Sequence, residues 1–84
     1  MVRLSYRKLS DGSIVSNLIP FQTMSLYAFI NVKTLTYEIR SLVNGEVSIE
    51  RGGLGKSIRS IKDAIRADMK ELGVVFKDEI RKKL

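Results

Sequence analysis

The chain has 84 residues, of which 44% are hydrophobic and 29% charged, and its formal net charge is +6. This length suits one compact domain, and the hydrophobic fraction is that of a chain that folds. The sequence contains no cysteine and no histidine, which excludes disulfides, thiolate nucleophiles, zinc-finger ligation and imidazole acid–base catalysis. No signal-peptide core is visible and no apolar run approaches the roughly 20 residues of a membrane span. We therefore expect a soluble protein of the cytoplasm.

The positive charge is concentrated in the C-terminal part of the chain. Residues 1–50 contain five lysines or arginines and four acidic residues, whereas residues 51–84 contain ten and five. An excess of this kind favours polyanionic partners such as nucleic acid, an acidic protein surface or an anionic membrane.

The N-terminal residues predict two strands. Residues 2–7 alternate apolar with polar side chains, which is typical of a strand with one buried face. Asp11-Gly12 then predicts a two-residue hairpin turn of type I′. A second strand is expected over residues 14–19, and Pro20 ends or bends it because proline cannot donate to a ladder.

The clearest strand pattern covers residues 23–33. All its even-numbered positions from 24 to 32 are apolar, and they face one side of the expected sheet. The opposite side carries Tyr27 and Phe29. Two aromatic residues on a nominally outer face indicate that this face is covered or functional.

The next residues predict a return strand and a second hairpin. A turn is expected at 31–34, followed by a strand in which apolar and polar residues alternate over 35–40. Asn44-Gly45 predicts another two-residue turn into a last strand at 46–50. Residues 51–53 (Arg-Gly-Gly) are expected to break that strand and lead into a helix.

Residues 54–72 predict one amphipathic helix. Its apolar positions share a narrow arc when successive residues are set about 100° apart, and they are Leu54, Ile58, Ile61, Ile65, Met69 and Leu72. Along one edge of this arc lies a row of cations, interrupted only by Asp63. These cations are Lys56, Arg59, Lys62, Arg66 and Lys70. We call this row the basic edge. An apolar arc is needed for docking on a sheet, but a one-sided row of cations is not.

The helix is expected to end at Gly73, a suitable left-handed C-cap, with Val74 supplying an apolar contact. A short C-terminal helix is then expected over 75–84, where apolar residues recur every four positions. The sequence thus predicts a single α+β domain over residues 1–84. It consists of an antiparallel β-meander of about five strands, a long amphipathic helix and a short C-terminal helix.

The basic edge suggests the first functional hypothesis, a small non-enzymatic protein that binds nucleic acid. Cations recurring every three or four residues can follow a phosphate backbone, which gives affinity with little sequence preference. The expected contacts are the five residues of the basic edge, flanked by Arg51, Arg81, Lys82 and Lys83. The alternative is a solvated helix face whose cations only keep the protein soluble.

The glycine-rich segment before the helix suggests a second hypothesis, a small anion site. A nucleotide-binding P-loop is not supported, because its first glycine would have to stand where this chain has Glu50. Free amides at a helix N-terminus could still bind an anion. The residues concerned are Gly52, Gly53, Gly55, Lys56 and Ser57. The alternative is a plain connection from sheet to helix, capped by Ser57 or Gly55.

A third hypothesis is a protein-interaction or inhibitor module, homodimeric or larger, that docks on an acidic protein surface. Tyr27 and Phe29 could serve such an interface, or they could stack unpaired bases. The carboxylates and serines form no recognisable catalytic set. We therefore expect no enzymatic activity, no metal site and no cofactor.

Overall fold

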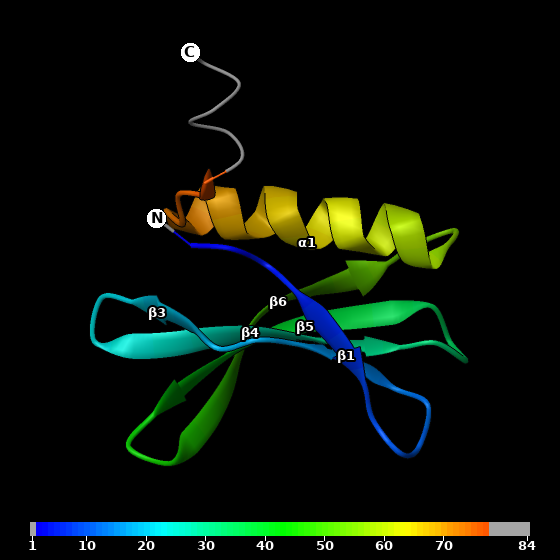
Figure 1. Cartoon of the computed structure of the whole chain (residues 1–84), viewed down its shortest axis with the longest axis horizontal. Helices are drawn as coiled ribbons and strands as arrows, with labels where there is room; N and C mark the ends of the chain where they lie inside the picture. Colours follow the sequence, from blue (N-terminus) through cyan, green and yellow to red (C-terminus); the bar gives the residue numbers. More distant parts are fainter. Residues whose placement is uncertain (1, 78–84) are drawn as a thin grey trace.

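The computed structural model describes residues 2–77, which form one antiparallel sheet with a single helix across one face (Figure 1). The elements are β1 (Tyr6–Lys8), β2 (Ile14–Ser16), β3 (Ile19–Phe21), β4 (Met24–Asn31), β5 (Thr36–Val43), β6 (Glu46–Leu54) and α1 (Ile58–Leu72). The sheet order is β1-β2-β4-β5-β6, and β3 also pairs with β4. The predicted α+β meander followed by a long helix is therefore confirmed.

The predicted second strand is divided into β2 and β3, which pair with different parts of β4. Ser16 lies at the division, where its hydroxyl accepts a hydrogen bond from the Ala28 amide at 2.8 Å. Pro20 lies inside β3, opposite Ser25, rather than at the end of a strand. Among the described strands β3 pairs only with β4, so the missing proline N–H interrupts no second ladder.

Both predicted hairpins are present, but only the second has the predicted two-residue type I′ turn. Asn44 and Gly45 both have positive φ, at 51° and 81°, as a type I′ turn requires. At the first hairpin only Gly12 has positive φ, and its amide donates to the Leu9 carbonyl at 3.0 Å. The loop there has three residues, because the Asp11 carboxylate accepts from the Ser13 amide at 2.9 Å and supports a wider turn.

The predicted break at residues 51–53 is wrong, since β6 continues to Leu54. Gly52 pairs with Glu38 and Gly53 with Tyr37, beyond a bulge opposite Ile39 and Arg40. The Tyr37 ring lies so close to Gly53 that a β-carbon there would be 3.1 Å from it. The glycines therefore permit a close approach within the sheet and do not end the strand.

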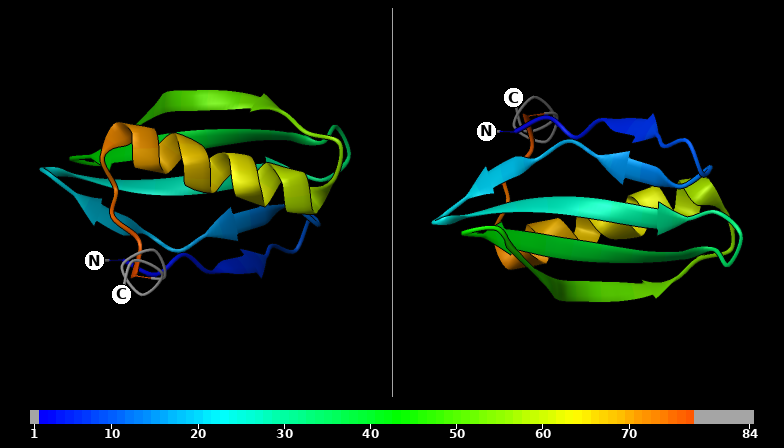
Figure 2. Two further views of the ribbon diagram at one scale, coloured as in Figure 1. Left: turned by 90° about the horizontal axis from the view of Figure 1, so that it is seen from above. Right: turned by 90° about the horizontal axis from the view of Figure 1, so that it is seen from below.

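The helix begins later than predicted, at Ile58. Ser57 is the N-cap and forms a capping box with Ser60, so the expected cap at Ser57 is confirmed. Leu54 belongs to β6 and is 78% exposed, which removes it from the predicted apolar arc. The helix lies across one face of the sheet and leaves the other face uncovered by any described element (Figure 2).

The core lies between α1 and the sheet. Ile61, Ile65 and Met69 are fully buried there, which confirms the apolar arc over these positions. They pack with side chains of the sheet and of the segment after the helix: Ile19, Leu26, Ala28, Ile30, Tyr37, Ile39, Val74 and Phe76.

The chain after the helix returns to the N-terminal segment. Gly73 adopts the predicted left-handed conformation, with φ at 117°. Phe76, within the range expected to be helical, instead forms a parallel bridge with Val2. The remaining part of the predicted C-terminal helix, 78–84, lies outside the described residues. No helix in the described part of the chain is long and apolar enough to cross a membrane.

Candidate functional site

The basic edge lies on the flank of α1 that borders β1 and the segment around Phe76. Lys56, Arg59 and Lys70 are exposed, whereas Lys62 and Arg66 are half-buried. The Lys62 ammonium lies 4.8 Å from the centre of the Tyr6 ring in β1. The Arg66 guanidinium lies 4.5 Å from the centre of the Phe76 ring.

These two ring contacts fix the middle of the basic edge. Phe76 is 1% exposed, so Arg66 covers a ring that belongs to the core. Burial raises the pKa of Tyr6 to about 12. A cation over an aromatic face gains about 0.5–1 kcal/mol when exposed and more when desolvated. Lys62 and Arg66 thus hold their charged groups against aromatic rings of the protein.

The acidic side chains near the end of the helix are engaged on the opposite flank. The Tyr37 hydroxyl donates to the Asp68 carboxylate at 2.6 Å. The pKa of Tyr37 is raised to about 12, first by burial and then by this hydrogen bond. Glu71 forms an ion pair with Arg51 of β6, at 3.7 Å. Arg51, predicted to flank the basic edge, therefore lies with the acids on the other side of the helix.

The first strand adds cations that the sequence analysis did not include. An open groove of about 340 Å³ lies where β1 and β2 meet the helix, and Tyr6, Arg7, Lys8 and Lys62 contribute to its lining. The signal in the sequence was a charged pair, Arg7-Lys8, at the end of a predicted strand. Only the tertiary fold brings that pair beside Lys62.

The glycine-rich segment does not present the free amides expected of an anion site. The Gly55 amide donates to the Leu35 carbonyl at 3.0 Å. The Lys56 and Ser57 amides donate to the Ser60 hydroxyl at 3.1 Å and 3.0 Å. Gly52 and Gly53 belong to β6. This segment connects and caps the helix, and its last three amides already have partners inside the protein.

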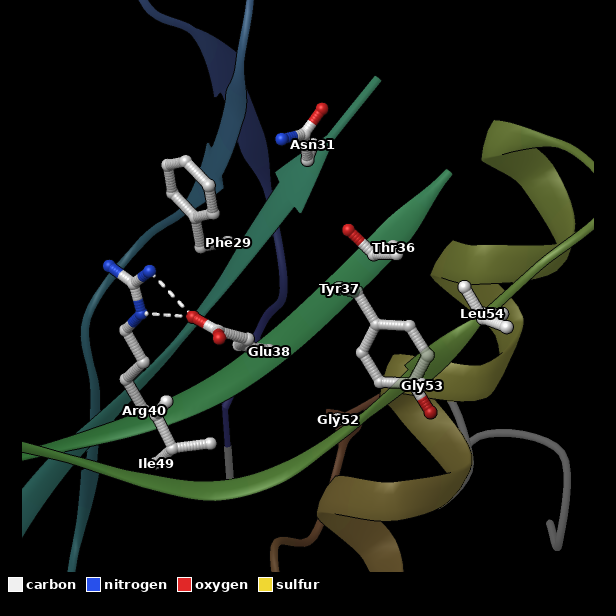
Figure 3. Close-up of a pocket in the computed structure, with 10 residues that line it drawn as sticks. All are labelled: Phe29, Asn31, Thr36, Tyr37, Glu38, Arg40, Ile49, Gly52, Gly53 and Leu54. Carbon is white, nitrogen blue, oxygen red and sulfur yellow. Dashed lines mark hydrogen bonds and ion pairs between the residues drawn. The ribbon is translucent and has the colours of Figure 1, made fainter. Parts of the chain in front are cut away.

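Tyr27 and Phe29 lie on the face of the sheet opposite α1, as predicted. Tyr27 is paired with Arg40 and Phe29 with Glu38, so these four residues share one face. The Arg40 guanidinium lies 4.5 Å from the Phe29 ring centre and donates to one Glu38 carboxylate oxygen from Nε at 2.8 Å and from Nη2 at 2.6 Å (Figure 3). Half-buried aromatic rings thus remain on a face that no described element covers.

Three predicted contacts stay predictions, because they lie outside the described residues: Arg81, Lys82 and Lys83. Within residues 2–77, no group of three or more acidic side chains could hold a metal ion.

The described residues define a class: a small α+β domain with a helix across one face of an antiparallel sheet and cations along one flank of that helix. Comparisons with protein-family models, curated proteins and solved structures gave no match. The case for function therefore rests on the geometry of the chain.

Proposed function

We propose that this protein binds nucleic acid non-enzymatically, holding the phosphate backbone along the basic edge of α1. The observation that supports this most is the separation of charge across the helix. The cations occupy the flank beside β1, whereas Asp68 and Glu71 are engaged with Tyr37 and Arg51 on the other flank. A phosphate backbone that approaches the β1 side would meet a row of cations. Asp63 is the acid that interrupts this row.

The length of the basic edge suits this ligand. From Arg59 to Lys70, both within α1, the helix advances by roughly 16 Å. Phosphates on one strand of a duplex advance by about 3.4 Å each along the axis, so this part of the edge is long enough for about five of them. Lys8 of β1 extends the same surface beyond Lys62. These contacts carry no base-specific information, so we expect little sequence preference.

The test removes charge from exposed side chains. Lys62 and Arg66 cover aromatic rings, so the variant to use replaces the exposed residues, as Lys56→Gln, Arg59→Gln and Lys70→Gln together. Each lost phosphate contact should reduce the slope of log affinity against log salt by about one. We expect the triple variant to bind DNA and RNA more weakly, with a slope smaller by about two to three.

The control is a variant with a matched change in charge elsewhere. Ser48→Glu, at an exposed position of β6, changes the net charge by the same amount as Arg59→Gln alone. It should leave affinity nearly unchanged, whereas Arg59→Gln should weaken binding. A folded triple variant that binds as tightly as the wild type, with the same salt slope, would refute the proposal.

A further inference from the structure

The helix-free face of the sheet contains a groove of about 610 Å³ (Figure 3). Phe29 and Arg40 form one side, and Ile49 and Leu54 of β6 contribute apolar walls. Gly52 lies between these two β6 residues and is paired with Glu38. Because Gly52 has no side chain, the floor of the groove stays open at this point.

One wall of the groove is pre-organised as a flat stack. Two hydrogen bonds from Arg40 to Glu38 hold the guanidinium over the Phe29 ring. The side chains of Arg40 and Glu38 remain 28% and 36% exposed. Aromatic rings and guanidinium planes are the surfaces on which unpaired bases stack in single-stranded complexes. A base entering here would find this surface already ordered.

The groove includes a residue close in the chain to the start of the basic edge. This residue, Leu54, is followed two positions later by Lys56, and the Gly55 amide donates to the Leu35 carbonyl at 3.0 Å. That bond joins the end of β6 to the turn that carries Lys33. Lys33 and Lys56 are both exposed, and the turn lies at the same end of the molecule as the start of α1 (Figure 1). Phosphates leaving the groove would therefore meet cations from two loops.

We infer that this groove binds an unpaired base of single-stranded nucleic acid, with the adjoining phosphates directed toward Lys33 and Lys56. The inference rests on the proposed function and restricts its ligand to single-stranded nucleic acid. Bases in a duplex are stacked on each other and expose only their edges, so they cannot lie against Phe29. The protein should therefore bind a single strand more tightly than a duplex of equal phosphate number.

The test compares the two ligands in one variant. Phe29→Leu keeps an apolar side chain but removes the ring, and it should weaken binding of a labelled oligothymidine by about 5- to 100-fold, as for the loss of one stacked base. Duplex affinity should not change. Val47→Ala is the control, because Val47 is 52% exposed on the same strand as Ile49 but does not line the groove. It should leave both affinities unchanged.

The outcomes separate this inference from the proposed function. Unchanged single-strand affinity in folded Phe29→Leu would overturn the inference, and the charge variants would still test the backbone proposal independently. If Phe29→Leu does not fold, the NMR chemical shifts of the wild-type amides on adding oligothymidine test whether the groove binds the base. Shifts at Arg40, Gly52 and Gly53 support the groove, and their absence overturns it.

A second copy of the chain is the competing occupant. Three results together would show that this face is a contact between copies. The wild-type protein would be a dimer in solution, Ile49→Asp would be a monomer, and the two would bind oligothymidine with equal affinity. These results would also overturn the inference.

Discussion

Two tyrosines attach opposite flanks of the helix to the sheet. Tyr6 of β1 lies under Lys62, 4.8 Å from its ammonium to the ring centre, and Tyr37 of β5 donates to Asp68 at 2.6 Å. Both rings pack against the core. Gly53 allows the second contact, because a side chain there would meet the Tyr37 ring. On one flank a tyrosine ring therefore contacts a cation, and on the other a tyrosine hydroxyl binds an acid.

Both tyrosines should ionise late. Burial is the main cause in each case, and it raises the pKa of Tyr6 and Tyr37 from 10 to about 12. The folded state thus holds these protons more tightly than the unfolded state. The stability they contribute is complete below pH 10 and is lost as the pH rises to about 12. A near-ultraviolet titration of tyrosinate should show both late ionisations.

Comparing the titration of the wild type with that of one variant shows which late ionisation belongs to which tyrosine. Tyr37→Phe should remove one late ionisation and reduce the loss of stability across the same alkaline range. An ionisation of Tyr37 near pH 10 in the folded protein would contradict the burial described for this ring.

The candidate site could be predicted only in part at this scale. The positions of four cations of the basic edge follow from helical spacing within α1, whereas Lys56 lies before the first residue of the helix. The partners of those cations come from distant segments: Tyr6 lies under Lys62 and Phe76 under Arg66. No local pattern encodes these pairs, which is why Arg51 was expected beside the basic edge and is found beside Glu71.

Among the elements, the helix depends on its capping box. The Ser57 hydroxyl accepts from the Ser60 amide at 3.1 Å, and the Ser60 hydroxyl accepts from the Ser57 amide at 3.0 Å. No acidic residue lies in the first turn, so these serines are the main local stabilisation of that end. We expect Ser57→Ala to lower the free energy of unfolding by about 1 kcal/mol, measured by urea titration.

A second substitution at the cap separates capping from other effects. Ser57→Asp keeps an acceptor for the Ser60 amide and adds a negative charge at the helix N-terminus, where the dipole favours it. Its stability should equal or exceed that of the wild type. If Ser57→Ala were as stable as Ser57→Asp, the cap would contribute nothing.

At the same scale, turns and strand ends show where sequence patterns succeed and fail. Asn44-Gly45 was predicted correctly, because both residues adopt positive φ readily and no side chain competes. Asp11-Gly12 has the same signature, but the Asp11 carboxylate accepts from the Ser13 amide and a longer loop forms. The two glycines of β6 have the pattern of a strand end. They lie inside the strand, however, where a side chain would come too close to Tyr37 of the neighbouring strand.

At the scale of the whole molecule, the two described ends of the chain are hydrogen-bonded to each other. The Val2 amide donates to the Val75 carbonyl at 3.1 Å, and the Lys77 amide donates to the Val2 carbonyl at 3.0 Å. Phe76 between them is 1% exposed and lies under Arg66. The bridge thus connects the first described residues, the segment after the helix and the basic edge. An alternating N-terminal pattern could predict the buried face but not this parallel partner.

Phe76→Ala should therefore destabilise the whole protein and not only its end. Removing a buried phenylalanine side chain costs about 3–5 kcal/mol, a large part of the roughly 5–15 kcal/mol typical of a folded domain. We expect a clearly lower urea midpoint, with faster hydrogen exchange at Ile30 and Ile39 as well as at Val2. Val75→Ala is the control, since Val75 is 53% exposed and its change should stay within about 0.5 kcal/mol. Faster exchange confined to Val2 and Lys77 would instead mean that the ends open independently of the sheet. The basic edge would then keep its shape without Phe76, and nucleic-acid affinity would survive the substitution.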